Sequence, residues 1–142
     1  MIERTVIALI LIALVLVVSL AVRAHTRRRT AKAVGTSLPV ALTQRLPGRG
    51  PAIVYFYGPH CADCRHQAAV LQRLAADRGI AVARVDATRE SSLADTLAVM
   101  TVPSTMVVDA TRHVRAVNLG FRPYDDLFAQ LRDLGEATAE VA

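Results

Sequence analysis

The stretch YFYGPHCADCRHQ, residues 55–67, contains both cysteines of this 142-residue chain, Cys61 and Cys64. The apolar and aromatic run AIVYFY, residues 52–57, leads into it and suits a strand that is buried on both faces. Gly58 and Pro59 end that run, and from Cys61 to about residue 77 apolar residues recur at helical spacing. The stretch therefore predicts a strand, a tight turn and a helix that begins at a cysteine.

Two cysteines separated by two residues are compatible with a redox dithiol, a metal site, a haem attachment or a structural disulfide. The first turn of a helix carries unpaired N–H groups and a partial positive charge, so a thiolate at Cys61 is stabilised there and becomes a better nucleophile at neutral pH. Cys64 follows one turn later and can reach a mixed disulfide formed at Cys61. The position of the pair therefore favours a redox dithiol.

The other three uses of the pair have less support. A structural zinc site usually needs four ligands, and His60 and His66 would have to complete the set, so copper or zinc handling stays open as an alternative. Haem attachment needs a histidine directly after the second cysteine, where this chain has Arg65. A disulfide that closes a loop of two residues constrains the unfolded chain very little.

The rest of the chain predicts an α/β domain with a mixed sheet. Further strands are expected at 80–85, 104–109 and 113–120, with helices at 92–99 and 123–134. A short strand at 38–42 is also considered, although Pro39 makes it ambiguous. In this order, two parallel strands joined by a crossover helix are followed by an antiparallel hairpin and a covering helix.

With these elements in place, residues 50–134 resemble the thioredoxin family. Cys-Ala-Asp-Cys at 61–64 matches the family's Cys-x-x-Cys, and Val-Pro-Ser at 102–104 stands where the family has its cis-proline. Gly120 matches the glycine that lets the substrate backbone approach. The resemblance implies a thioredoxin-like fold of βαβαββα order and the activity of a thiol-disulfide oxidoreductase.

The resemblance also implies roles for individual residues. Cys61 would attack the substrate disulfide and Cys64 would resolve the mixed disulfide. The Val102–Pro103 bond would be cis, and the backbone of Val102 would pair with an extended substrate. The implied partners are protein disulfide substrates and an electron donor, either a dithiol protein or a reductase, with no dissociable cofactor and no metal.

Several positions depart from the family pattern. His60 replaces a tryptophan beside the substrate face, Tyr55 stands in the place of a buried acid, and Ala69 replaces a proline that kinks the helix. Arg84 stands near a lysine position of the family and Asp86 near a polar one, so the proton route to Cys64 is expected to differ.

The hypothesis that contrasts with an oxidoreductase is a metal-handling or redox-inert binding module on the same fold.

Asp63 and His60 should have opposite effects on a thiolate at Cys61. The carboxylate of Asp63 disfavours a thiolate at Cys61 and makes the couple more reducing, whereas a protonated His60 would do the reverse. Because Asp63 is charged at pH 7 and an exposed histidine is mostly neutral, a reductant is expected.

The N-terminal part of the chain predicts a membrane anchor. Residues 5–22 contain no charge, and as a helix they would span about 27 Å, close to the thickness of the hydrocarbon layer. We expect an N-terminal flank at 1–4, a transmembrane helix at 5–22, a basic juxtamembrane tether at 23–35 and a thioredoxin-like domain at 36–142. A cleavable signal peptide is the alternative, although the apolar run exceeds the usual signal core.

The net charge of +5 resides beside this anchor. Residues 33–142 contain 11 arginines and 11 acidic residues, so the expected domain is neutral and offers no basic face for nucleic acid. The basic residues that follow the anchor are Arg23, Arg27, Arg28, Arg29 and Lys32, against Arg4 before it. By the positive-inside rule this predicts a single-pass membrane protein with its redox domain in the cytoplasm, the extracytoplasmic face being the alternative, and the basic residues are expected to bind lipid headgroups.

Overall fold

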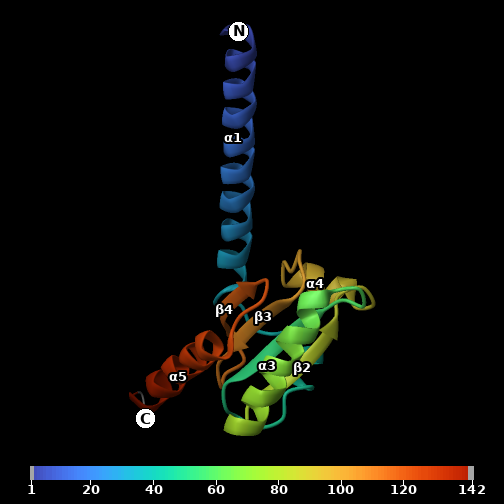
Figure 1. Cartoon of the computed structure of the whole chain (residues 1–142). Coiled ribbons are helices and arrows are strands. Elements are labelled where there is room, and N and C mark those ends of the chain that lie inside the picture. The colour runs from blue at the N-terminus through green and yellow to red at the C-terminus, as the bar shows by residue number, and fades with distance from the viewer. Residues whose placement is uncertain (1, 141–142) are drawn as a thin grey trace.

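The computed structural model describes residues 2–140 and consists of one long helix joined to a folded domain (Figure 1). Helix α1, Ile2–Ala33, projects away from the domain, and its large apolar side chains are exposed along residues 6–22. Within the described residues it is the one helix long and apolar enough to cross a membrane, a test that a signal sequence near an N-terminus also passes. The segment expected as a tether at 23–35 is helical as far as Ala33.

The sheet of the domain has four strands in the order β2-β1-β3-β4. Strand β1, Ala52–Tyr57, pairs in parallel with β2, Ala81–Asp86. Strand β3, Ser104–Val108, pairs antiparallel with β1 on its other side and with β4, Val114–Leu119. The predicted parallel pair and antiparallel hairpin are thus confirmed.

Helices cover both faces of this sheet, which explains the uninterrupted apolar run of β1. Ile53 and Tyr55 face α3, Ala62–Arg78, and α5, Tyr124–Glu140, in one buried cluster with Leu71, Leu74, Leu127 and Leu131. Val54 and Phe56 face α4, Ser91–Thr96, and α2, Val40–Thr43, in a second cluster with Leu42, Leu46, Ala94 and Leu97. Alternate residues of a strand point to opposite faces, so a strand between two helical layers has to be apolar throughout.

The possible strand at 38–42 is wrong. Residues 40–43 form α2, and the carbonyl oxygen of Pro39 accepts the N–H groups of Leu42 and Thr43. Leu38, Leu42 and Leu46 are buried four residues apart whereas Val40 is exposed, which is helical periodicity rather than alternation. Only the preceding residues are extended, with Ser37 bridged to His113 beside β4.

The other boundaries differ from expectation by a few residues. Helix α4 ends at Thr96 rather than residue 99, and α5 continues to Glu140, beyond the predicted end at 134. Helix α3 ends at Arg78 and is capped by Gly79, whose φ of 65° is the left-handed conformation that favours glycine after a helix.

Candidate active site

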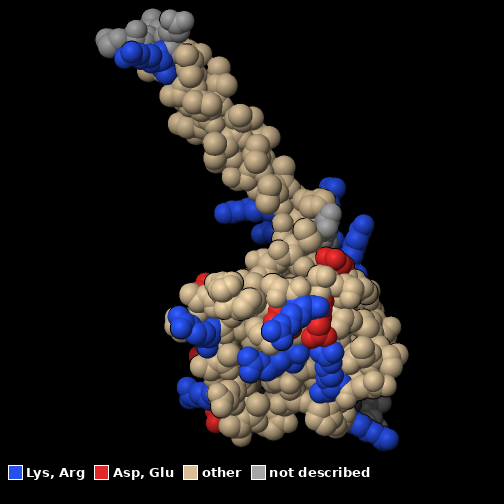
Figure 2. Space-filling model, turned by 90° about the vertical axis from the view of Figure 1, so that its right-hand side faces the viewer, with Lys and Arg blue, Asp and Glu red and all other residues tan. Residues whose placement is uncertain are grey.

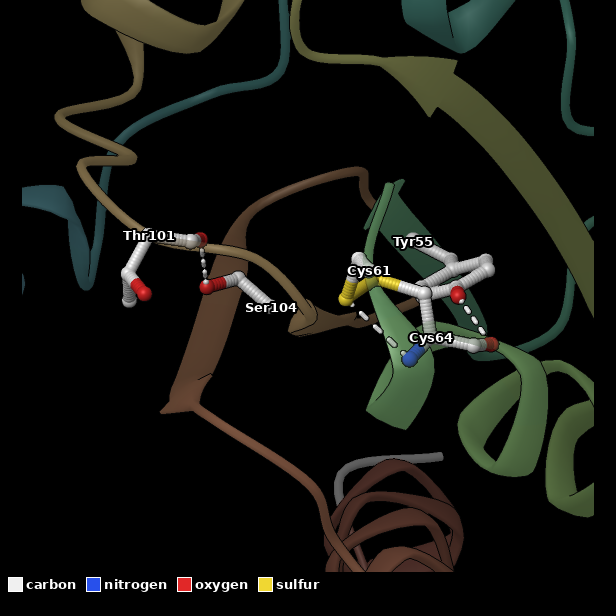
Figure 3. Close-up of a disulfide and its surroundings, with 5 residues drawn as sticks. All are labelled: Tyr55, Cys61, Cys64, Thr101 and Ser104. Atoms are coloured by element: carbon white, nitrogen blue, oxygen red, sulfur yellow. Dashed lines mark hydrogen bonds between the residues drawn. A yellow bond between two sulfur atoms is a disulfide. The ribbon is translucent and has the colours of Figure 1, made fainter. Parts of the chain in front are cut away.

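The two cysteines lie where β1 passes into α3. Gly58 and Pro59 turn the chain, Cys61 is the N-cap residue of α3, and Cys64 lies in its first turn. They form a disulfide, with 5.2 Å between their Cα atoms (Figure 3). The N–H of Cys64 donates to Sγ of Cys61 at 3.1 Å, so the sulfur atom itself caps the helix. A negative charge on this sulfur would face the partial positive charge of the helix N-terminus.

Cys61 and Cys64 differ in their exposure to solvent. Cys61 is partly exposed, whereas Cys64 is buried, with 5% of its surface accessible. Cys64 packs in the same buried cluster as Tyr55, Leu71 and Leu74. A substrate can therefore approach Cys61 from solvent but not Cys64.

Tyr55 lies directly beneath the disulfide. Its ring is buried, and its hydroxyl donates a hydrogen bond of 2.6 Å to the carbonyl oxygen of Cys64 (Figure 3). Burial raises the pKa of Tyr55, although the nearby charge of Arg84 opposes this shift. The position at which the family resemblance implies a buried acid therefore holds a neutral phenol that stabilises the first turn of α3.

A cavity of about 500 Å³ opens beside the cysteines. Its charged or titratable side chains other than the cysteines are His60, Arg65, Arg84, Tyr55 and Tyr57, and no carboxylate lines it among the described residues. The guanidinium of Arg84 lies 5.0 Å from the ring centre of Tyr57 and 5.9 Å from that of Tyr55. Asp63 is exposed in the first turn of α3 and does not line this cavity, whereas His60, which is expected to act oppositely on the Cys61 thiolate, does.

The loop before β3 completes the site. The Val102–Pro103 peptide bond is cis, as the resemblance implies. Val102 packs against the turn that precedes Cys61, since a Cβ atom at Gly58 would come within 3.3 Å of Cγ2 of Val102. Ser104 fixes this loop by donating a hydrogen bond of 2.7 Å to the carbonyl oxygen of Thr101 (Figure 3).

Gly120 joins the same loop through its backbone. Its N–H donates to the carbonyl oxygen of Pro103 at 2.8 Å. Its φ of 79° favours glycine, and a Cβ atom there would meet open space. The structure thus brings Gly120 together with Val102 and Pro103, which precede it by 18 and 17 residues in the chain.

Sequence analysis missed Gln67, a residue of α3 that bonds to the backbone just before α5. Gln67 is fully buried in α3, donates to the carbonyl oxygen of Arg122 at 3.2 Å and accepts from its N–H at 2.7 Å. Gln67 lies three residues after Cys64 and four before Leu71, on the helix face predicted to be buried. That spacing is the signal that could have identified it.

A second polar group that the sequence did not reveal lies under α5. The side-chain amides of Asn118 and Gln130 exchange two hydrogen bonds of 2.9 and 3.0 Å, and Asn118 also donates to the hydroxyl of Thr105. These bonds connect β3, β4 and α5, and Asn118 is two residues before Gly120. Among the described residues, no three His, Cys, Asp or Glu side chains converge on a position for a metal ion.

Comparisons with known proteins agree with this geometry. The thioredoxin family profile matches residues 41–133, more than half of the chain. A thioredoxin from Alicyclobacillus acidocaldarius is 29% identical over 94 residues, which cover 64% of this chain and 88% of that protein. The fold is similar to a mutant thioredoxin from Halobacterium salinarum, with a TM-score of 0.61, 19% identity and coverage of 69% of this chain and 87% of that one.

A thioredoxin-2 of the malaria parasite has a similar fold, with a TM-score of 0.56, 23% identity and coverage of 59% of this chain and 82% of that one. A disulfide with one reachable sulfur at the start of a helix is the kind of site that thiol-disulfide oxidoreductases use. The chain belongs to the thioredoxin family. It is a thiol-disulfide oxidoreductase whose Cys-x-x-Cys pair is Cys61 and Cys64.

Proposed function

We propose that this protein is a membrane-tethered disulfide reductase that acts on protein disulfides through Cys61. The observation that carries the proposal is the asymmetry of the cysteine pair: Cys61 is partly exposed at the N-cap of α3, and Cys64 is buried behind it. Because only one sulfur is reachable, the order of the two chemical steps follows.

In the first step, the Cys61 thiolate attacks one sulfur of the substrate disulfide, forms a mixed disulfide and releases the other substrate sulfur as a thiolate. In the second step, the deprotonated Cys64 attacks Sγ of Cys61, which forms the Cys61–Cys64 disulfide and releases the reduced substrate. The enzyme dithiol loses two electrons and two protons, and the substrate disulfide gains them and becomes a dithiol. A dithiol protein or a reductase must then return two electrons to the pair, and no dissociable cofactor is needed.

The substrate would lie across Cys61 and the cis-proline loop. We assign the backbone of Val102 to pairing with an extended substrate, while Pro103 and Gly120 shape the surface beside it. The open space at Gly120 supports close approach of a second backbone. His60 would contact the substrate from the other side of Cys61, since it lines the cavity there.

The direction of exchange rests on the charge nearest to Cys61 in the sequence. Asp63 lies in the first turn of α3, where its carboxylate disfavours a thiolate at Cys61 and stabilises the oxidised pair relative to the reduced one. Such a couple donates electrons. The proposal is therefore a reductant rather than an oxidant.

The tether is assigned to α1. Its apolar residues 5–22 would span the hydrocarbon layer, and the basic residues from 23 to 32 would hold that flank, with the domain, on the cytoplasmic side. If the domain is instead extracytoplasmic, the same chemistry would serve the partners of that compartment.

A redox titration of the full chain in detergent tests the chemistry. We expect one reversible two-electron couple, insulin reduction by the native chain and none by Cys61→Ser. Cys64→Ala should accumulate mixed disulfides on Cys61, and trapping them in intact cells identifies the substrates and their compartment. The proposal fails if the two reduced sulfurs remain protonated and inaccessible to alkylating agents near neutral pH.

A further inference from the structure

The last turns of α1 lie against the domain near the redox site. A cavity of about 240 Å³ is lined on one side by Val22 and Thr26 of α1. On its other side lie Ala98 and Met100, which precede the cis-proline loop, and Leu119 at the end of β4. The helix therefore runs beside the segments that lead into Pro103 and into Gly120, two of the residues assigned to the substrate surface.

The contact between α1 and the segment before Pro103 determines how far that segment lies from a bilayer that α1 spans. Val22 is the last residue of the uncharged run, so it marks the edge of the hydrocarbon layer if α1 spans the membrane. Thr26 is four residues further on, which is about 6 Å along a helix, and the headgroup layer is about 5–8 Å thick. Residues that share a cavity with Val22 and Thr26 thus lie at the level of the headgroups.

The cysteine pair lies close to that level. Val102, two residues after Met100, packs against the turn that leads to Cys61. The first turn of α3, which contains the pair, lies at the end of the domain that faces α1, and its last turn lies at the opposite end (Figure 1). The carboxyl end of the parallel strands, where the site is built, therefore faces the membrane side.

Charge and polarity at this end fit a lipid surface. Arg23, Arg27 and Lys32 are exposed on α1, and basic side chains gather where the helix meets the domain (Figure 2). Each can contribute about 1 kcal/mol of attraction to an anionic leaflet. Met100, which shares a cavity with α1, has 69% of its surface exposed, as suits a side chain that enters the interface between water and lipid.

We infer that the Cys61–Cys64 pair works at the surface of the bilayer and that its substrates are disulfides of membrane proteins held close to the headgroups. This inference rests on the proposed function, because it names the substrate class of that same site. A disulfide within about one helix diameter of the lipid, ~10 Å, can reach Cys61 without moving the domain. A disulfide presented far above the membrane would have to approach a site that faces the other way.

The geometry is tested on the full chain in nanodiscs that contain phosphatidylglycerol. In a Cys61→Ser, Cys64→Ser background, a fluorophore is attached at Met100→Cys or, as the matched control, at Asp77→Cys in the last turn of α3. We expect a lipid-attached quencher to reduce the emission at position 100 at least threefold more than at position 77. Equal quenching at the two positions would overturn the inference.

The substrate class is tested with one disulfide peptide in three forms: free, tethered to lipid by a short linker, and tethered by a linker of about 100 Å. We expect the native chain to reduce the short-linker peptide at least fivefold faster than the long-linker peptide. Inserting twelve Gly and Ser residues after Val34 should abolish this preference while the free peptide is reduced at the native rate. The same twelve residues appended after Ala142 should leave the preference unchanged.

The outcomes distinguish failure of this inference from failure of the proposed function. If the free peptide is reduced but the short linker gives no advantage, or the insertion after Val34 preserves the advantage, the present inference fails and the proposed reductase stands. If none of the three peptides is reduced, the proposed function fails, and this inference fails with it.

Discussion

At the scale of single residues, Arg84 is the least expected feature of the site. It lies on β2, and the sequence predicts only that it alters the proton route to Cys64. In the structure it lines the cavity beside the cysteines and lies over the rings of Tyr55 and Tyr57. Its charge also opposes the effect of burial on the pKa of Tyr55.

Replacing Arg84 by methionine should make the cysteine couple more reducing. A cation in the cavity favours the thiolate of the reduced pair, so its loss destabilises the reduced form. We expect the potential to fall by about 10–30 mV, which redox titration against glutathione measures. Arg78→Met is the matched control, because Arg78 lies 4.2 Å from the ring centre of Phe128 at the far end of α3. An unchanged or raised potential in Arg84→Met would contradict this role.

At the scale of elements, the site depends on a hydrogen-bonded connection between α3 and the segment before α5. Gln67 alone satisfies both the N–H and the carbonyl group of Arg122. Burial of Gln67 makes the connection costly to break, because the partly buried N–H and carbonyl groups of Arg122 would lose this partner.

Gln67→Leu should therefore lower the free energy of unfolding by about 2–3 kcal/mol, as measured by urea denaturation. Gln72→Leu provides the control on the same helix, since Gln72 is exposed. We expect that control to change the stability by less than about 0.5 kcal/mol. Equal effects of the two substitutions would show that the buried connection contributes nothing.

Asp109, in the turn between β3 and β4, makes the stability of the domain depend on pH in the acid range. Burial of Asp109 favours its protonated form, but hydrogen bonds from His113, Thr111 and Arg115 outweigh this and lower the pKa of the carboxyl group to about 2. The unfolded chain therefore binds a proton on Asp109 at a higher pH than the folded chain does. The stabilisation is complete above about pH 4 and disappears as the pH falls to about 2.

Comparison with Asp109→Asn isolates this contribution from those of other carboxylates. At pH 7 the native chain should be more stable than the variant by about 2 kcal/mol. The difference should shrink below pH 4 and vanish near pH 2, as followed by urea unfolding at a series of pH values. A difference that is constant across this range would mean that Asp109 does not titrate as described.

At the scale of the whole molecule, the basic residues after the apolar run are proposed to set the orientation of the chain. Replacing Arg23, Arg27, Arg28 and Lys32 by glutamine leaves one basic residue on each flank of residues 5–22, Arg4 and Arg29. The orientation should then become mixed, because the bias between the flanks is lost. Labelling of Cys61 by a membrane-impermeant thiol reagent in reduced cells measures it. The proposed topology is wrong if the native chain is labelled from outside.

The sequence predicted most of this molecule because its signals are local. The apolar run of β1, the turn at Gly58 and Pro59, and the stripe that contains Cys64 and Leu71 each follow from neighbouring residues, and the order of elements then restricts the topology. The exception is the segment around Leu42, where alternation and helical spacing overlap in a short stretch and only burial against the sheet separates them.

Local patterns in the sequence were enough to predict the reactive pair, its place at the start of a helix and the layered sheet that carries it, because polarity and turn residues act over a few positions. The packing of the folded chain was needed to show that Cys61 is reachable and Cys64 is not, that Gln67 bonds to the backbone of Arg122, that Arg84 lies over the rings of Tyr55 and Tyr57, and that α1 runs beside the loop before Pro103. Those relations join residues that are distant in the chain. They depend on packing in three dimensions, which no local pattern encodes.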